Sequence, residues 1–384
     1  MTDSPPLAIR KLTLTDFRSY AGLRLLVPSG LVALVGANGA GKTNILEAIS
    51  LLVPGRGLRA APFGELARDG GALSWAVAAE LETADGLTSI GTGWSGQSEA
   101  GDGGGRLVVI DGAVQKTASA LGAHVRLLWL TPAQDRLFAG PASDRRRFLD
   151  RLVAAFDPEH ATRVASFEKL MRERNLLLEE MRPDPAWLAS LEAQMAEAAV
   201  AISAARLVGL EALRTHIGEG RSESSFPWAD VSVEGEIEAL VAAKPAVQVE
   251  DEYRRILSDS RGLDRAAGRS LRGPHRSDLA VVHGPRGVPA GQCSTGEQKA
   301  LLIALVLAQA RAVKAGAGVA PLLLLDEVAA HLDRTRRASL LEALAALGSQ
   351  SWMTGTDAQL FEEIGRKGTV FAVEDGSVRE AVEE

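Results

Sequence analysis

The chain has 384 residues, of which 46% are hydrophobic, a formal net charge of −7 and one cysteine, Cys293. This size allows one large domain or two to three lobes, the lone thiol excludes an intramolecular disulfide framework, and the charge argues against a uniformly basic nucleic-acid coat. The sequence shows no pattern of a secretory leader and no run of about 20 apolar residues, so we expect a cytoplasmic protein without a membrane anchor.

The first hundred residues favour strands on both sides of a glycine-rich turn. Apolar and polar residues alternate over 7–14 and 23–27, which predicts two strands joined by the turn "DFRSY". A fully apolar strand over 31–35 then leads through the turn 36–41 into a helix over about 42–52. Further strands are predicted over 73–81 and 87–93, and the glycines that follow are interpreted as a connection.

The middle of the chain is helical, and its end alternates between strands and helices. Long Ala-, Leu-, Glu- and Arg-rich patterns predict a helical lobe from about 143 to 218, folded back once at "MRPDP". Such a piece is too short for a long coiled coil. Strand and helix patterns then alternate, which predicts a sheet with crossover helices. They cover 278–283, 297–314, 321–325 and 334–347.

The stretch "GANGAGKT" fits GxxxxGK[ST] and lies where this motif works, between an apolar strand and a helix. Its glycines allow backbone N–H groups to surround a β-phosphate at a helix start. Lys42 would reach the β- and γ-phosphates of ATP, and the Thr43 hydroxyl would bind Mg²⁺. The predicted contacts in this stretch are Gly36, Ala37, Asn38, Gly39, Ala40, Gly41, Lys42, Thr43 and Asn44.

The second half of a nucleotide site is predicted in "PLLLLDEVAAHLD". Asp326 follows an apolar strand, at the edge where open α/β sheets bind ligands, and fits the Mg²⁺ side of the site. Glu327 is placed to polarise an attacking water as general base. Asp333 follows Glu327 at a separation that suits a loop crossing the same edge of the sheet. An alternative is an acidic pair that caps the next helix.

A third motif, "STGEQ", precedes another apolar helix. Ser294, Gly296 and Glu297 would present a hydroxyl, free N–H groups and the positive end of a helix dipole to a γ-phosphate. One chain already surrounds its own nucleotide with the other two motifs, so this site would close over the nucleotide of a second copy and produce an ATP-dependent homodimer. A plain N-cap formed by Ser294 with Glu297 explains the residues equally well.

Together these motifs are similar to the ABC-type ATPase heads of the family that includes structural-maintenance-of-chromosomes proteins and Rad50. Within it, "LTLTDFRSY", "LTPAQDRLFAGPASDRRRFLDRLV", "LRGPHRSDL" and "TGTD" resemble the RecF family of bacterial recombination mediators. The resemblance implies an α/β ABC-type head with an inserted helical lobe and no long coiled coil. It divides the chain into a head over 1–140 and 269–384 and a lobe over 141–268.

The resemblance also implies roles for residues outside the three motifs. Arg18 and Ser19 would lie near the phosphates or the base of the nucleotide. Gln134 would sense the γ-phosphate as a Q-loop residue. Thr354 or Thr356 would occupy the switch position, where many relatives carry a histidine, and this departure argues against fast hydrolysis.

A basic strip over 254–276 holds seven arginines and two aspartates, although the whole chain is acidic. The spacing of three to four residues from 254 to 272 could put several guanidiniums on one helix face, where they would contact DNA phosphates. The other interpretation is a solvated helix paired with neighbouring acids. A second basic patch, 143–151, is equally well explained as an internal salt-bridge face. No base-reading module is evident. The predicted DNA contacts are Arg254, Arg255, Arg261, Arg265, Arg269 and Arg272.

The implied function is an ATP-dependent, DNA-binding recombination mediator with weak Mg²⁺-dependent ATPase activity. It would dimerise on ATP, bind duplex DNA near single-strand gaps, and help load the recombinase in gap repair, replication restart and the SOS response. The resemblance implies RecR as a partner, and RecO through RecR. Two alternatives share the nucleotide motifs: a transporter ATPase subunit and an ATP-gated scaffold that does not hydrolyse ATP.

Overall fold

The computed structural model describes residues 7–96, 105–219 and 225–381, and these form two compact units. Unit 1 is built mainly from the residues up to 135 and from 302 onward, and unit 2 from 136–222 and 227–301. The first division lies close to the expected end of the head at 140. Unit 2 extends to 301 and includes β10, which pairs along its length with β9. The expected boundary of the lobe at 268 stays a prediction.

An antiparallel sheet forms one layer of unit 1, with strand order β2-β1-β4-β5-β6-β7. β1 and β2 are the two strands expected on either side of "DFRSY", and they extend into it, so that only Arg18 and Ser19 form the turn. The glycine-rich stretch 97–104 lies outside the described residues. The strands are β1 (Ala8–Phe17), β2 (Tyr20–Leu26), β4 (Trp75–Thr83), β5 (Gly86–Trp94), β6 (Leu107–Ile110) and β7 (Ala113–Val114).

A mixed sheet forms the second layer of unit 1, in the order β15-β14-β3-β13-β12-β8. Its inner strands pair in parallel, and β3 and β12 are buried at every position, which explains their continuous apolar runs. The strands are β3 (Leu31–Val35), β8 (Leu127–Leu130), β12 (Leu322–Leu325), β13 (Ser351–Gly355), β14 (Gly368–Glu374) and β15 (Ser377–Glu380).

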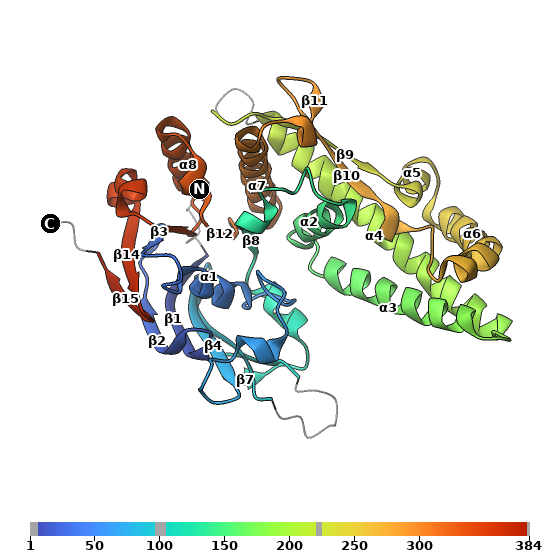
Figure 1. The fold of residues 1–384 in the computed structure, drawn as a ribbon, viewed down its shortest axis with the longest axis horizontal. Helices are drawn as coiled ribbons and strands as arrows, with labels where there is room; N and C mark the ends of the chain where they lie inside the picture. The colour runs from blue at the N-terminus through green and yellow to red at the C-terminus, as the bar shows by residue number, and fades with distance from the viewer. Residues whose placement is uncertain (1–6, 97–104, 220–224, 382–384) are drawn as a thin grey trace. The chain divides into compact units, whose positions relative to one another are not determined.

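Helix α1 (Lys42–Ser50) packs into the core that the two sheets of unit 1 share. Leu12 of β1, Leu34 of β3, Ile45 and Ile49 of α1, and Trp352 of β13 belong to this one cluster of buried residues. Helix α8 (Arg334–Leu347) has the bounds expected from the sequence and connects β12 to β13. It lies on the opposite side of the mixed sheet from α1 (Figure 1).

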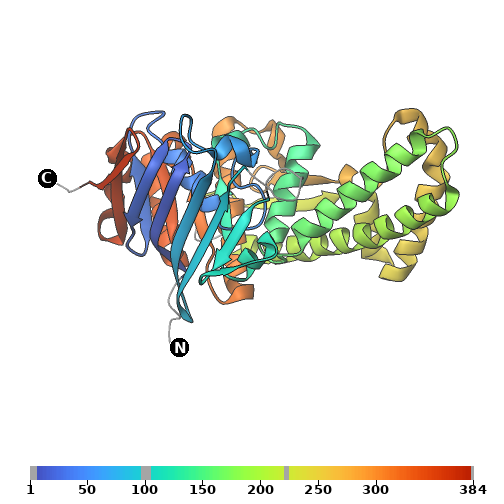
Figure 2. The same ribbon diagram turned by 90° about the horizontal axis from the view of Figure 1, so that it is seen from below.

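Unit 2 combines helices with a three-stranded sheet in the order β11-β10-β9. Helices α3 and α4 lie side by side and fold back at residues 180–184, where the sequence predicts the break (Figure 2). The elements are α2 (Ala142–Ala154), α3 (His160–Glu179), α4 (Pro185–Glu219), β9 (Ala229–Glu234), α5 (Glu236–Ala243), α6 (Ala246–Ala267), β10 (Asp278–His283) and β11 (Val288–Pro289).

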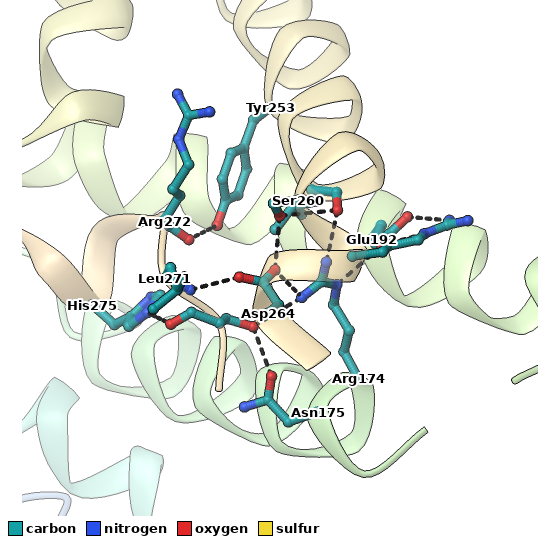
Figure 3. Close-up of polar contacts among 12 residues, drawn as sticks. Arg174, Asn175, Glu192, Tyr253, Ser260, Asp264, Leu271, Arg272 and His275 are labelled. Atoms are coloured by element: carbon teal, nitrogen blue, oxygen red, sulfur yellow. Dashed lines mark hydrogen bonds and ion pairs between the residues drawn. The ribbon is translucent and has the colours of Figure 1, made fainter. Parts of the chain in front are cut away.

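A buried ionic network joins three helices of unit 2 (Figure 3). Arg174 of α3 has no exposed surface, and its guanidinium donates to Glu192 of α4 at 3.0 Å and to Asp264 of α6 at 2.8 Å. It also donates to the Leu257 carbonyl at 2.7 Å and to the Ser270 hydroxyl at 3.0 Å. Because every branch of the guanidinium is satisfied, the network fixes how the helices pack, and removing one partner would leave a buried charge unpaired.

Helix α7 (Thr295–Ala317) begins slightly before the helix expected at 297. Among the residues that the structure describes, it is the one helix long and apolar enough to cross a bilayer, with a mean hydropathy of 1.6 in its most apolar window. Within the protein, 67% of that window is buried. A buried core helix of a globular protein meets the same criteria of length and composition.

Candidate nucleotide site

The loop "GANGAGKT" connects β3 to α1 and requires glycine at two positions. Gly36 and Gly41 have φ angles of 158° and 107°. A Cβ on Gly36 would lie 2.2 Å from the Val373 carbonyl oxygen, and one on Gly41 would lie 2.7 Å from the Tyr20 hydroxyl. These glycines therefore allow the backbone to coil tightly in front of α1, with its N–H groups at the positive end of the helix.

Lys42 is 5% exposed and folds back over this loop. Its Nζ donates to the carbonyl oxygens of Gly36 and Ala37, each at 2.7 Å. Burial lowers the pKa of Lys42, while the nearby carboxylates of Glu327 and Asp326 raise it. The ammonium is thus held at the loop and within electrostatic reach of both acids.

Asp326 lies at the carboxyl end of β12, two strands away from β3, and contacts α1. Thr43 Oγ1 donates to its Oδ1 at 3.0 Å, and Thr354 Oγ1 donates to the same oxygen at 2.7 Å. The structure therefore brings together Lys42, Thr43, Asp326 and Glu327, as the sequence predicts, and Thr354 joins them. Thr356 is exposed, so of the two threonines expected at the switch position only Thr354 contacts the acidic pair.

A hydroxyl beside a carboxylate fits Mg²⁺, which prefers oxygen ligands and keeps several sites for water and phosphate. The described part of the chain contains no group of three or more His, Cys, Asp and Glu side chains that could hold a metal by themselves. Thr43 and Asp326 supply only two oxygen ligands. Such a pair suits a Mg²⁺ ion that arrives with a nucleotide and takes its other ligands from phosphate and water. In the presence of the ion, these two residues would hold it on the Mg²⁺ side of the site.

Gln134 lies at the same edge of the sheet. It follows β8, which pairs with β12 so that Leu130 is opposite Leu325. Its Oε1 accepts from the Thr131 N–H at 3.0 Å in a capping box, which fixes the start of a short turn. A Q-loop role for Gln134 stays a prediction.

The "DFRSY" turn is fastened to the phosphate loop and to α1. The Arg18 guanidinium binds both oxygens of Glu47 at 2.9 Å, Ser19 Oγ accepts from Asn44 Nδ2 at 2.9 Å, and the Tyr20 hydroxyl donates to the Gly41 carbonyl at 3.1 Å. Direct contact of Arg18 and Ser19 with a nucleotide stays a prediction, because the structure shows their bonds to the loop and helix.

Glu47 and Tyr20 were not predicted as parts of this site. Glu47 is 1% exposed and also binds Arg59 Nη1 at 2.9 Å. A glutamate within the apolar pattern of α1 was the available signal, since a buried charge needs partners. The sequence did not reveal those partners because they lie in other segments.

The motif "STGEQ" forms the start of α7 and contains the N-cap that the sequence allows. The Ser294 hydroxyl and backbone N–H both donate to Glu297 Oε2, at 2.8 and 2.9 Å. These bonds, together with Arg286, lower the pKa of Glu297 to about 2. Ser294 and Gly296 are exposed. The N-cap alternative is thus present, and a γ-phosphate site formed with a second copy stays a prediction.

Asp333 also caps a helix. Its Oδ1 accepts from the Arg336 N–H at 2.9 Å at the start of α8, and the side chain is exposed. Contact between Asp333 and a nucleotide stays a prediction.

The expectation that the basic strip continues along one helix to residue 272 is wrong. Helix α6 ends at Ala267, and Gly268 adopts a left-handed conformation with φ 64°. Arg269 and Arg272 therefore follow the helix and cannot share its face. Spacing places three of the remaining arginines on one face of α6. These are Arg254, Arg261 and Arg265.

Acidic side chains hold three of the six arginines predicted to bind DNA, which agrees with the ion-paired alternative for those three. Arg265 donates to the Glu180 carbonyl oxygen at 2.9 Å and is exposed, as are Arg255 and Arg269. DNA contact by this surface stays a prediction. The ion pairs are Arg254 with Asp251, Arg261 with Glu192, and Arg272 with Glu236.

The second basic patch, on α2, makes internal contacts within unit 2. Arg145 binds both oxygens of Asp278, at 2.8 and 2.6 Å, and Arg146 donates to the Ser277 carbonyl at 3.1 Å. These bonds fasten α2 to the start of β10. Arg147 is exposed and pairs with Asp144.

Comparisons with known proteins agree with this architecture. A family model described as RecF/RecN/SMC N terminal domain matches residues 8–379. The DNA replication and repair protein RecF of Mesorhizobium japonicum is 52% identical over 371 residues, which cover 96% of this chain and 97% of that protein. The chain belongs to the RecF family. The RecF protein of Rhizobium leguminosarum is 49% identical over 373 residues, 97% of this chain and 99% of that protein.

Solved structures show the same fold. The recombination mediator protein RecF-ATPrS of the RecFOR pathway matches with a TM-score of 0.87 and 23% identity, over 100% of both chains. An Smc head domain from Pyrococcus furiosus with an extended coiled coil matches with a TM-score of 0.54 and 17% identity, over 98% of this chain and 96% of that one. The expected ABC-type head, as found in RecF and SMC proteins, is confirmed.

Proposed function

We propose that this RecF-family chain is an ATP-dependent, DNA-binding recombination mediator that dimerises on ATP. The observation that carries the proposal is the meeting of Lys42, Thr43, Asp326 and Glu327 at one edge of the mixed sheet of unit 1. Its curated relatives are DNA replication and repair proteins, and a structural relative was solved as RecF-ATP in the RecFOR pathway.

The residues of unit 1 suit binding and slow hydrolysis of ATP. The N–H groups of the phosphate loop and the Lys42 ammonium bind the β- and γ-phosphates. Thr43 and Asp326 would hold Mg²⁺, which would neutralise charge on the phosphates. Glu327 polarises the attacking water, Gln134 senses the γ-phosphate, and a threonine in place of the usual histidine at the switch position keeps hydrolysis slow.

Dimerisation would use the start of α7. Ser294, Gly296 and Glu297 of one copy bind the γ-phosphate held by the phosphate loop of the other, and Asp333 crosses the same interface. Two ATP molecules then lie within the dimer, and hydrolysis opens it. Ser294 is exposed at the start of α7, which supports this proposal, and its hydroxyl and N–H would exchange their bonds to Glu297 Oε2 for bonds to the γ-phosphate.

DNA binding and partner binding complete the cycle. The exposed arginines of α6 and the following loop contact duplex phosphates near a single-strand gap, with little sequence preference. The protein acts in the cytoplasm with RecR, and with RecO through RecR, to help load the recombinase in gap repair, replication restart and the SOS response.

The proposal is tested by Glu327→Gln in the full chain, with phosphate release and light scattering as the two measurements. Loss of the general base is expected to lower the rate of phosphate release by about 100-fold or more and to let the ATP-bound dimer accumulate. The control is Glu342→Gln, an exposed glutamate of α8, which should change neither measurement. Unchanged turnover in Glu327→Gln rejects its role as base, and a parent chain without turnover supports the scaffold alternative.

A further inference from the structure

Thr354 is a buried residue at the end of β13 whose hydroxyl joins the two acids of the nucleotide site. Its side chain has no exposed surface. β13 is parallel to β12 with Leu325 opposite Met353, so Thr354 lies beside Asp326. Its Oγ1 donates to Asp326 Oδ1 at 2.7 Å and accepts from the Glu327 N–H at 2.8 Å. One hydroxyl thus donates its proton to the Asp326 carboxylate and accepts the backbone N–H of Glu327 with a lone pair.

The backbone that this hydroxyl holds is in an uncommon conformation. Glu327 has φ 51° and ψ 25°, in the left-handed region that residues with a side chain rarely adopt. Such a conformation persists only where its surroundings hold it in place, and it is frequent at functional sites. The bond from the Glu327 N–H to Thr354 is a direct restraint on this backbone.

The same hydroxyl also fixes how Asp326 meets α1. Thr43 and Thr354 donate to one oxygen of the Asp326 carboxylate, at 3.0 and 2.7 Å. Glu327 and Asp326 both lie within electrostatic reach of the Lys42 ammonium, because both raise its pKa against the effect of burial. The hydrogen bonds of the Thr354 hydroxyl go to Asp326 and to the Glu327 N–H, so its influence on the phosphate loop passes through these two residues.

We propose that Thr354 is a positioning residue for ATP hydrolysis, whose hydroxyl sets the Glu327 carboxylate relative to Asp326. This role rests on the proposed function. It separates two steps: the phosphate loop binds the nucleotide, and the Thr354 bridge aligns the general base. Loss of the bridge should therefore lower the turnover number and leave ATP affinity nearly unchanged.

Two substitutions in the full chain test this role. Thr354→Val keeps the shape but removes the hydroxyl, and Thr354→Ser keeps the hydroxyl. We expect Thr354→Val to lower kcat by about tenfold or more, with the Kd for ATP within about threefold of the parent, because misalignment of a catalytic group costs rate more than binding. Thr354→Ser should restore most of kcat. Hydrogen exchange without nucleotide gives a second readout: the Glu327 amide should exchange faster in Thr354→Val only.

Thr92→Val is a matched control. Thr92 is 4% exposed and its hydroxyl also donates to one group, the Leu107 carbonyl, and accepts from another, Arg106 Nε. Thr92→Val should lower thermal stability, and it should lower kcat much less than Thr354→Val does. Equal losses of kcat in both valine variants, an unchanged kcat in Thr354→Val, or an equally protected Glu327 amide would overturn the role of Thr354 alone. A parent chain without turnover would contradict both this role and the proposed function.

Discussion

Glu47 shows how single residues of unit 1 build the site from separate segments. It is buried in α1, one turn after Thr43, and binds Arg18 from the β1–β2 turn and Arg59 from the segment after α1. Ionised pairs of this kind gain strength from low exposure of the carboxylate, provided that its partners stay in place. Glu47 therefore ties the "DFRSY" turn to the helix that carries Lys42 and Thr43.

Glu47→Gln should lower the free energy of unfolding by about 1–3 kcal/mol, because a neutral amide replaces a carboxylate that binds two guanidinium groups. Urea denaturation with the tryptophans of unit 1 as probes measures the change. Glu65→Gln is the control, since Arg18 binds only the backbone carbonyl of the exposed Glu65. Equal stability of the Glu47 variant and the parent would contradict the stabilising role of the two Glu47 ion pairs.

The sequence allowed prediction of Lys42, Thr43, Asp326 and Glu327 because each follows a local rule: a glycine-rich loop before a helix, or an acid at the end of an apolar strand. The roles of Tyr20, Glu47 and Thr354 were not predictable in this way. Their partners lie in other elements, and only the strand order β3-β13-β12 places Thr354 beside Asp326.

At the scale of elements, most helices and strands follow from hydrophobic periodicity, and α8 has the expected bounds. The end of α6 was missed although its signal was present. Gly268 follows the last helical residue and adopts the left-handed conformation that ends many helices. The arginine spacing alone suggested a longer helix, because it continues at three to four residues beyond the glycine.

Helix α6 offers a direct test of DNA binding, because neighbouring arginines on it differ in their partners. Arg255→Ala should weaken binding to gapped duplex and lower the slope of affinity against salt concentration by about 1, as expected for one lost phosphate contact. Fluorescence anisotropy at several salt concentrations measures both.

Arg261 gives the opposite expectation on the same helix. It pairs with Glu192, which is 3% exposed and also binds the buried Arg174. Arg261→Ala should therefore reduce the stability of unit 2 more than its DNA affinity. An unchanged salt slope in Arg255→Ala would exclude that residue from the DNA surface.

At the scale of the whole molecule, the chain crosses between its two compact units, and the motifs divide between them. The phosphate loop and the acidic pair belong to unit 1, whereas Ser294 belongs to unit 2 with the arginines of α6. The sequence predicts a head and a helical lobe and places 269–301 in the head, whereas β10, within this range, belongs to unit 2. Strand and helix patterns do not show which sheet a strand joins. Only the pairing of β10 with β9 decides this.

The central claim is that ATP forms part of the interface between two copies of the chain. Sedimentation of the full chain with and without ATP and Mg²⁺, in parallel with Ser294→Arg and Ser294→Asp, tests it most directly. Aspartate keeps a good helix cap and places negative charge where the γ-phosphate would bind. Because Ser294 would contact only the nucleotide of the other copy, both variants should bind ATP within about threefold of the parent. The account predicts that only the parent becomes a dimer, and only with ATP. A parent that stays monomeric at saturating ATP, or a Ser294 variant that dimerises normally, would contradict it.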